Sequence, residues 1–560
     1  MIAQETAARQ EAAPTKVWCG ALADEFDVVV VGSGAPGLTA ALAAAQAGAS
    51  VVVLEKADYL GGTSAVSGGM IWVPMNRCMM ELGLEDTRDD ALDYLTAISD
   101  GRTPKPILET LVDRGTEMLG FVETQSDLRF ETLENFPDYH PEWPGSHPGG
   151  RSLEPVLYDA TLLGDLADSL RPDHRPPFTM REYEEWRIFT HFPYDELGER
   201  AAQNLVSRGR ALVAPLLRAC ADRGVTFVTG CPVQRLTSDG VAVNGVTTDT
   251  GHVGARSGVI LACGGFEWSA EMAASYLPGP IQASCSPPHN TGDGLRMGTK
   301  VGAKLGNLNE AWWGPMVLIP GDEIDGAPTG TLLRFERTGP GSVIVNKEGR
   351  RFVNEAHNYN DMTKAFHAFD PGSYTHRNLP AWLIFDHGHL NSYGFLGHRV
   401  SEPTPDWLVE AATLSELAAK VGIESNALEA TVARFNTHAA NGEDPDFNRG
   451  QSAYDRYWGD LDAQHPALGP LDSPPYYAIE VVSGAIGTKG GLVTGAAGQA
   501  LDAFDDEIPG LYAVGNTTAQ PMGPGYAGAG STLGPGMTMG YAAGLAAAVV
   551  RAATPLGVTT

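Results

Sequence analysis

A glycine-rich loop near the end of the chain carries a single tyrosine. The sequence runs Gly-Pro-Gly-Tyr-Ala-Gly-Ala-Gly-Ser from 523 to 531, and Gly515-Asn516 precedes it. Because glycines leave backbone amides uncovered, the loop places N–H donors close to the phenol of Tyr526. Such donors can stabilise negative charge that develops on a carbonyl oxygen. Together with Gly32-Ser-Gly-Ala-Pro-Gly37, this loop predicts a cofactor site that is built from both ends of the chain.

The elements around the first glycine motif predict a βαβ unit. Residues 26–31 form a short apolar run, which is typical of a strand buried on both faces of a parallel sheet. Residues 38–47 form a helix of small residues, and residues 50–54 form the second strand. The chain is therefore expected to contain an α/β domain with a Rossmann-like parallel sheet.

The spacing of the glycines in this unit predicts dinucleotide binding. Gly32 makes the tight turn, Gly34 lets a pyrophosphate approach the backbone, and Gly37 allows the helix to pack closely on the strand. The helix N-terminus stabilises the phosphate charge. Glu55 ends the second strand, where a carboxylate can accept hydrogen bonds from the ribose hydroxyls.

Further glycine-rich segments favour FAD over NAD. Gly61-Gly-Thr-Ser64 and Ser67-Gly-Gly69 follow the acidic residue directly, and their backbone donors suit a pyrophosphate and the edge of an isoalloxazine ring. Asn290-Thr-Gly-Asp-Gly294 and Gly515-Asn516 add loops that a nicotinamide enzyme does not need. The residues that we expect to bind the cofactor are Gly32, Gly34, Gly37, Glu55, Lys56, Gly62, Thr63, Ser64, Gly68, Gly69, Val233, Gly264, Asp293, Gly515, Asn516 and Leu533.

The composition of the chain changes along its length, and this predicts its domain organisation. Residues 1–25 are a polar arm, and 26–311 are the first part of the FAD-binding domain, with a proline-rich excursion or lid at about 130–200. The aromatic-rich sequence with mixed helix and strand patterns at 312–486 indicates an inserted α+β catalytic domain. The glycine-rich composition of the first part returns at 487–560, which we assign to the second part of the FAD-binding domain.

Charge and cysteine content narrow the expected partners and location. The chain has 68 acidic and 38 basic side chains, which argues against nucleic acid and anionic membrane surfaces as partners. Its six cysteines are spread singly, its 14 histidines are scattered, and no metal site is predicted. The first 25 residues hold no apolar signal segment, and the late apolar run at 545–550 is too short to span a bilayer. We therefore expect a cytoplasmic protein without integral membrane association.

With these motifs the chain resembles the fumarate reductase/succinate dehydrogenase flavoprotein superfamily. That family can attach its flavin covalently through a histidine just after the Gly-Gly pair. This chain has Thr63-Ser64-Ala65 there. The resemblance therefore implies a non-covalent FAD.

Within this superfamily the chain is similar to 3-ketosteroid Δ1-dehydrogenases. The resemblance rests on Phe136-Pro-Asp-Tyr-His140, Arg351-Phe-Val-Asn-Glu355 with Tyr359 close behind, Gly487-Thr-Lys-Gly-Gly491, and Tyr526-Ala-Gly-Ala-Gly530. It extends from about residue 26 to 545. Where the family has prolines in the last string, this chain has alanines, which puts the substrate range in more doubt than the chemistry.

The resemblance implies a role for each of four residues. Tyr359 corresponds to the base that removes the C2 proton, and Tyr139 to the tyrosine that assists it. Tyr526 and the backbone amide of Gly530 correspond to the donors that hold the C3 carbonyl oxygen. The implied reaction also transfers a hydride from C1 to the flavin N5 and leaves a 1,2 double bond. The expected substrate is thus an apolar cyclic ketone, a 3-ketosteroid, and the external electron acceptor is not identified.

The implied chemistry agrees with elementary acidity. A C–H bond beside a ketone becomes acidic only when the enolate oxygen is stabilised, and losing one such donor costs about 2.7–4 kcal/mol. A free tyrosine has a pKa of about 10, so it is a poor base at neutral pH, and hydrogen bonding from Tyr139 is expected to favour the Tyr359 phenolate. Activity is therefore expected to rise toward alkaline pH.

Three other functions remain open at this stage. One is a related desaturase of a cyclohexanone-type ketone or of the 4,5-bond of a 3-ketosteroid, because each needs an enolising site facing the flavin. A soluble fumarate reductase would need arginine and histidine to hold two carboxylates, whereas the reacting positions here are tyrosines. A flavin-binding module without turnover is the non-enzymatic alternative.

Overall fold

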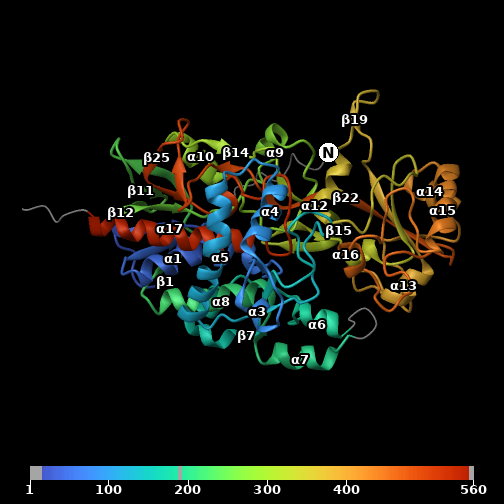
Figure 1. Ribbon diagram of the computed structural model, residues 1–560, viewed down its shortest axis with the longest axis horizontal. Coiled ribbons are helices and arrows are strands. Elements are labelled where there is room, and N and C mark those ends of the chain that lie inside the picture. The colour runs from blue at the N-terminus through green and yellow to red at the C-terminus, as the bar shows by residue number, and fades with distance from the viewer. Residues whose placement is uncertain (1–14, 187–191, 554–560) are drawn as a thin grey trace, which may run out of the picture.

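Two large β-sheets organise the chain. The computed structural model describes residues 15–186 and 192–553, and Figure 1 shows the two sheets side by side. One has nine strands and the other has seven. The catalytic candidates named above lie outside the strands of both sheets.

The nine-stranded sheet confirms the expected α/β architecture. Neighbouring strands pair in parallel in the series β9–β3–β2–β12–β25. In sheet order the strands are β1 (Lys16–Cys19), β9 (Thr226–Thr229), β3 (Val51–Leu54), β2 (Glu25–Val31), β12 (Gly251–Leu261), β11 (Val243–Thr248) and β10 (Val233–Ser238), with β25 (Glu507–Ala513) on β12 and β24 (Gln499–Leu501) on β25.

The predicted βαβ unit is present at the centre of this sheet. Strand β2 is buried from Phe26 onward, α1 (Ala35–Gln46) follows it, and β3 is buried throughout. Val28 of β2 pairs with Val51 of β3 in parallel register. The valine runs fit because both faces of the strands are covered, so no polar alternation is needed.

The C-terminal helix packs directly on this unit. Helix α17 (Leu533–Ala553) lies along α1 in Figure 1. A Cβ atom at Gly540 would lie 2.3 Å from the carbonyl oxygen of Pro36, and one at Gly544 would lie 2.2 Å from that of Ala40. Glycines four residues apart therefore let the two helix backbones touch, and this contact brings the two ends of the chain together.

The expected loose arm at residues 1–25 is wrong for its second half. Residues 1–14 lie outside the described residues, but Lys16–Cys19 form β1, which pairs antiparallel with β9. The Trp18 indole N–H donates to the Thr229 hydroxyl at 2.9 Å, and the Lys16 ammonium lies 3.4 Å from the Trp18 ring. These contacts outweigh the polar composition and complete the edge of the sheet.

Two helices precede the proline-rich excursion. They are α4 (Arg88–Ser99) and α5 (Lys105–Gln125), and Pro104 lies at the start of the second. The excursion that follows contains short elements: β5 (Phe130–Thr132), β6 (Ser152–Pro155), β7 (Tyr158–Asp159), the 3₁₀ segment η1 (Ala160–Ser169), α6 (Met180–Glu185) and α7 (Tyr194–Ala202). Helix α8 (Arg208–Ala221) follows the excursion.

The seven-stranded sheet lies at the other end of the molecule. Its strand order is β16 (Ala327–Leu332), β15 (Ala311–Ile324), β22 (Tyr476–Thr488), β20 (Ala381–Asp386) and β17 (Ser342–Asn346), with β13 (Ala283–Ser284) and β21 (Val409–Ala411) also on β22. Side chains alternate between two cores: Val343 and Val345 face one, and Ile344 faces the other. The proposed domain boundaries remain our interpretation.

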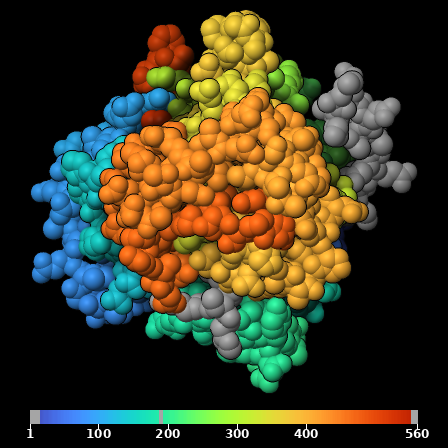
Figure 2. Space-filling view, turned by 90° about the vertical axis from the view of Figure 1, so that its right-hand side faces the viewer, coloured from blue at the N-terminus to red at the C-terminus, as the bar shows by residue number. Residues whose placement is uncertain are grey.

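Helices cover the outer face of this sheet. Figure 2 shows that this end of the molecule is formed mainly by the yellow to orange part of the chain. It includes α13 (His387–Tyr393), α14 (Leu414–Val421), α15 (Ser425–Ala439) and α16 (Ala453–Tyr457). Leucine and valine side chains of α14 and α15 share a core with β17.

The remaining elements are short. They are α2 (Gly62–Ala65), β4 (Ile71–Trp72), α3 (Arg77–Glu81), β8 (Leu205–Val206), α9 (Ala270–Tyr276), α10 (Asp293–Lys300), β14 (Leu305–Gly306), α11 (Phe335–Thr338), α12 (Tyr359–Lys364), η2 (Ala365–His367), β18 (Phe369–Asp370), β19 (Thr375–His376), β23 (Gly491–Leu492) and η3 (Gly515–Thr517). No helix within residues 15–186 and 192–553 is both long and apolar enough to cross a membrane.

The contact between α1 and α17 yields a prediction about stability. Gly544→Ala places a methyl group against the Ala40 carbonyl and should lower the free energy of unfolding by about 1–3 kcal/mol. Gly120→Ala, on the open face of α5, is the matched control and should be neutral or stabilising by up to about 1 kcal/mol. Urea unfolding of both variants measures the difference, and equal effects would show that the helices do not need this close approach.

Candidate active site

Three tyrosines from distant parts of the chain meet in one buried cluster. Tyr139 lies in the loop between β5 and β6, Tyr359 begins α12, and Tyr526 lies in the loop before α17. The hydroxyls of Tyr139 and Tyr359 are 3.1 Å apart. The ring of Tyr526 is 5.0 Å from that of Tyr139 and 5.6 Å from that of Tyr359. The three phenols expected to act together are therefore neighbours.

Burial dominates the acidity of these phenols. It raises the pKa of Tyr139 and of Tyr359 well above the ordinary value, and it also raises the pKa of Tyr526. The hydrogen bond between Tyr139 and Tyr359 contributes to the raised pKa of Tyr359, which differs from our expectation that Tyr139 favours its phenolate. The Thr532 hydroxyl donates to the Tyr526 hydroxyl at 3.2 Å and partly offsets burial there.

Gly530 presents its amide beside this cluster. Its φ of +93° is the left-handed region that favours glycine, and a Cβ atom there would lie 2.5 Å from the backbone of Ile71. In the part of the chain that the structure describes, its N–H donates to no protein acceptor. Since Gly530 and Tyr526 line the same cavity, both can offer a donor to a carbonyl oxygen.

Hydrogen bonds fix the loop that carries Tyr526. The carbonyl oxygen of Ala527 accepts the Tyr94 hydroxyl at 2.7 Å and the backbone N–H of Tyr139 at 2.9 Å. The Ser152 hydroxyl donates to the carbonyl oxygen of Ala529 at 3.0 Å. These contacts hold the loop in place although alanines stand where the family has prolines.

A buried lysine supports the same loop from the other side. The Lys489 ammonium donates to the carbonyl oxygens of Pro524 and Gly525 at 3.1 and 2.7 Å, and it lies 4.4 Å from the Trp312 ring. Burial lowers the pKa of Lys489 to about 7, and the positive charge of Lys364 contributes. Lys489 belongs to the Gly487–Gly491 string, so the family string has a structural function here.

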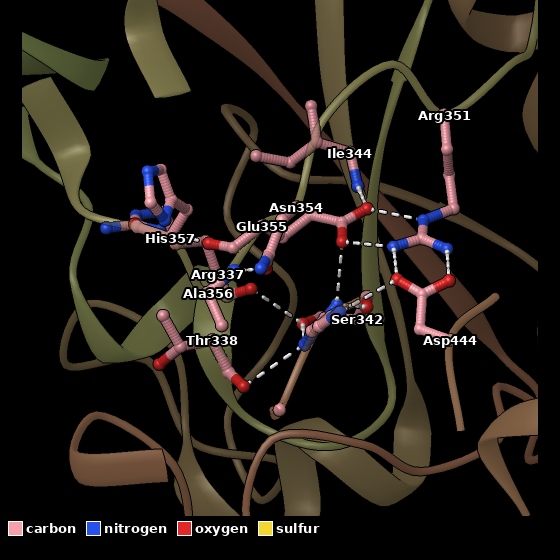
Figure 3. A network of polar contacts seen from close by, with 12 residues as sticks. Arg337, Thr338, Ser342, Ile344, Arg351, Asn354, Glu355, Ala356, His357 and Asp444 are labelled. Carbon is pink, nitrogen blue, oxygen red and sulfur yellow. Dashed lines mark hydrogen bonds and ion pairs between the residues drawn. The ribbon is translucent and has the colours of Figure 1, made fainter. Parts of the chain in front are cut away.

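The string Arg351–Glu355 forms a buried ion-pair network. Figure 3 shows Arg351 between the carboxylates of Glu355 and Asp444, which lie 2.6 and 2.8 Å from it. Arg449 lies 3.2 Å from Glu355, and Arg337 donates to the backbone carbonyls of Glu355 and His357. A buried carboxylate is tolerated only when its charge is paired, and the two arginines hold the pKa of Glu355 below its usual value against the opposing effect of burial. The network therefore fixes the backbone that leads into Tyr359.

An ion pair joins the segments of the two hydrogen-bonded tyrosines. His140 follows Tyr139, Asp361 lies two residues after Tyr359, and the two side chains are 2.8 Å apart. The other ring nitrogen of His140 lies 3.0 Å from Glu142. Burial alone would lower the pKa of His140, but these two carboxylates raise it to about 9. The charged imidazole thus locks both segments together at neutral pH.

His140 and Asp361, together with His357, form the one group of side chains in the described part of the chain that could hold a metal ion. Ligand atoms of His140, His357 and Asp361 lie within 4.8 Å of one another. Both ring nitrogens of His140 already face carboxylates, and a protonated imidazole does not coordinate a metal. The cluster is therefore explained by its internal ion pairs.

The glycine motif after β2 forms a cradle without side chains. Gly32 has a φ of +103°, and a Cβ atom there would lie 2.4 Å from the Ala262 carbonyl oxygen, as the tight turn requires. The backbone of Gly34, at the N-cap of α1, comes close to Gly62. This open backbone at a helix N-terminus fits the pyrophosphate of a dinucleotide.

Polar side chains surround the cradle. The Glu55 carboxylate accepts from the backbone N–H and the hydroxyl of Ser33 at 3.1 and 2.7 Å and remains at the cavity wall. Lys56 and Asp293, both expected in the cofactor site, form an ion pair of 2.7 Å. The Asn516 side-chain oxygen accepts the Trp312 indole N–H at 3.1 Å, which orients its amide.

One cavity of about 840 Å³ contains both the cradle and the tyrosine cluster. All the expected cofactor and catalytic residues line it except Gly37. Gly37 packs instead on the Gly32 carbonyl, where a Cβ atom would lie 2.4 Å away. This is the close helix–strand contact that the third glycine of the motif should make. The individual roles of these residues stay predictions.

Several residues of the cluster were not expected from the sequence. The ring of Tyr454, from α16, lies 4.9 Å from that of Tyr139. Nothing near Tyr454 in the sequence indicates this position. Three others lie inside or next to sequence strings named above: Lys489, His140 and Thr532. A polar residue inside or beside each string could therefore have indicated their place in the cluster.

Comparison with known proteins identifies the cofactor. The sequence model of a family described as FAD binding domain matches residues 27–533. FAD is thus confirmed as the cofactor, and the protein is an FAD-dependent oxidoreductase.

Individual relatives are similar over nearly their whole length. A protein named 4-oxocyclohexanecarboxylate 2-dehydrogenase from Sinomonas cyclohexanicum is 53% identical, over 93% of this chain and 92% of that relative. A 3-oxosteroid 1-dehydrogenase from Mycolicibacterium smegmatis is 40% identical, over 95% and 99%. The crystal structure of a 3-ketosteroid delta1-dehydrogenase from Sterolibacterium denitrificans superposes with a TM-score of 0.88 at 34% identity, covering 94% and 100%.

The His140–Asp361 ion pair yields a prediction about pH and stability. Because the pKa of His140 is raised from 6.5 to about 9, its stabilisation is complete below pH 6.5 and disappears as the pH rises to about 9. His140→Gln should therefore lower the free energy of unfolding by on the order of 3 kcal/mol at pH 6 and by much less at pH 9.5. Urea unfolding across this range measures the difference, with the exposed His252→Gln as the control. A loss that does not depend on pH would contradict the assignment.

Proposed function

We propose that this chain, which belongs to the FAD-binding-domain family of oxidoreductases, introduces a double bond beside the carbonyl group of a cyclic ketone. The observation that carries this proposal is the hydrogen-bonded pair of Tyr139 and Tyr359 beside Tyr526, in the cavity that also holds the cofactor motifs. Phenols and a free backbone amide suit a neutral carbonyl group.

Each residue of the cluster has a distinct part in the proposed reaction. The Tyr526 hydroxyl and the Gly530 amide donate to the ketone oxygen and stabilise the enolate that forms. Tyr359, as phenolate, takes the proton from the carbon next to the carbonyl, and the Tyr139 hydroxyl lies 3.1 Å from the Tyr359 oxygen. FAD, held without a covalent link by the glycine cradle and the polar residues around it, would supply the acceptor for the hydride of the adjacent carbon. One proton and one hydride leave, so the ring gains one double bond.

The relatives support two substrate classes for this proposal. The 53% identical relative is named for a six-membered ketone ring, so a cyclohexanone-type ring is the first substrate class that we propose. A 3-ketosteroid is the second, supported by the 40% identical relative and the TM-score of 0.88 to a steroid enzyme. Fumarate reduction is less well supported, because phenols occupy the reacting positions.

Anaerobic mixing with ketones tests the proposal. The flavin band should bleach with 4-oxocyclohexanecarboxylate or another 4-substituted cyclohexanone, and mass spectrometry should find a product two hydrogens lighter. Tyr526→Phe should slow the bleaching roughly 100- to 1,000-fold, because one donor to the enolate oxygen is lost. Bleaching with an androst-4-ene-3,17-dione alone would move the substrate to the steroid class. If none of these ketones bleaches the flavin band, the proposed reaction is excluded.

The pH dependence of bleaching tests the base. Because burial raises the pKa of Tyr359 well above its ordinary value, the fraction of phenolate keeps rising through pH 10. The bleaching rate constant should therefore increase steadily from pH 7 to 10 without a plateau. Tyr359→Phe should abolish most of the activity and the pH dependence with it. A plateau below pH 9 in the unchanged protein would point to a different base.

A further inference from the structure

Two arginines from separate segments line the cavity of a strongly acidic protein. The chain has a formal net charge of −30, yet Arg175 and Arg334 both line the cavity that contains the tyrosine cluster. They come from different segments: Arg175 from the excursion, and Arg334 from the turn between β16 and α11. Their convergence is not a consequence of composition.

Arg334 has a free guanidinium. Its backbone N–H donates to Glu336 at 2.9 Å, but its side chain makes no ion pair or hydrogen bond with any residue in 15–186 or 192–553. Its positive charge nevertheless acts on groups inside the cavity. Burial raises the pKa of Tyr139, and Arg334 partly offsets this effect.

Arg175 is held at the cavity wall with donors to spare. It pairs with Asp173 at 2.6 Å and donates to the carbonyl oxygens of Val66 and Ser67 at 2.8 and 3.2 Å. These bonds use Nε and one terminal nitrogen, and its Nη1 has no protein acceptor among the described residues. Val66 and Ser67 lead directly into the Gly68-Gly69 pair expected beside the cofactor.

A third arginine increases the positive field. Arg208 packs against the Phe178 ring at 4.1 Å and has no ion pair in the described parts of the chain. Burial and repulsion from Arg175 and Arg334 lower its pKa to about 9. The carboxylate of Glu154, also nearby, has a pKa raised by burial to about 7, so it neutralises this charge only in part. Among the described residues, Asp173 is the one carboxylate within ion-pair distance of these three guanidiniums, although Asp322, Glu323 and Asp325 also line the cavity.

We propose that Arg334 and Arg175 bind a carboxylate carried by the substrate on the side of the ring remote from the ketone. This inference rests on the proposed ring-ketone function and adds that the substrate is an anion. An arginine fork binds a carboxylate through two parallel hydrogen bonds, which fixes the orientation of the ring as well as its position. With its ketone at Tyr526 and its carboxylate at the arginines, the ring is held at both ends.

A matched pair of substrates tests the subsite. The holoenzyme is mixed anaerobically with 4-oxocyclohexanecarboxylate or with its methyl ester, which has the same ring without the charge. Arg334→Met should lower kcat/KM for the acid roughly 10- to 100-fold, through KM more than kcat, and should change the ester less than about twofold. Arg334→Lys should recover part of the loss, since it restores the charge but not the fork.

A control variant and a binding assay complete the test. Arg434→Met removes another exposed arginine, which lies on α15 and pairs with Asp446, so it should leave the turnover of both substrates unchanged. Cyclohexanecarboxylate has no ketone, so the enzyme cannot turn it over by the proposed reaction. It should still bind the holoenzyme in calorimetry, and Arg334→Met should weaken this binding roughly 10- to 100-fold.

Two outcomes would overturn the inference while the proposed function stands. One is equal turnover of acid and ester by the unchanged protein, with no effect of Arg334→Met. The other is an equal loss for acid and ester in that variant, which would make Arg334 merely structural. Failure of the unchanged protein to oxidise acid, ester and steroid would instead reject the proposed function itself.

Discussion

The structure depends on burying three phenols in one cavity while keeping their hydroxyls within reach of one another. Tyr139, Tyr359 and Tyr526 come from segments separated by more than 160 positions, so no local interaction brings them together. A buried hydroxyl also needs a hydrogen-bond partner, because an unsatisfied one is costly. Each segment is therefore fixed by its own buried polar contacts, and small displacements of any one would separate the hydroxyls.

The polar contacts differ in kind because the segments differ in length and flexibility. The segment before Tyr359 is short and follows β17, and two arginines hold it through the carboxylate of Glu355. The loop that carries Tyr526 lies against β4 but forms no β-bridge with the described residues, so Lys489 and neighbouring hydroxyl groups hold its carbonyl oxygens. Such networks are stabilising only when complete, and removing one charge leaves another buried without a partner. The Arg351–Glu355 string and Lys489 of the Gly487–Gly491 string thus hold the backbone segments that carry Tyr359 and Tyr526.

Much of the cofactor half follows from the sequence, because its signals are local. The strand, glycine turn, helix and acidic residue are contiguous, and each constrains the next within about 25 residues. The resemblance supplied the three tyrosines, which periodicity alone does not indicate. Three features could not be predicted from the sequence. Tyr454 joins the cluster through tertiary packing, β1 is stabilised by the hydrogen bond from Trp18 to Thr229, and the raised pKa of Tyr359 depends on burial. All three arise from contacts between residues far apart in the sequence.

The alanines at 527 and 529 change where the rigidity of the site comes from. Proline restricts the backbone by itself, whereas alanine must be restrained by its neighbours. Here the carbonyl of Ala527 accepts from both Tyr94 and Tyr139, so the Tyr526 loop is rigid only when the Tyr139 loop is in place. The Tyr526 loop and the Tyr139 loop are thereby coupled in one unit. Arg175 and Arg334 lie on other segments, so under the proposed function a ring substituent would be recognised without disturbing that unit. On that proposal, substrate range and chemistry can vary independently within this fold.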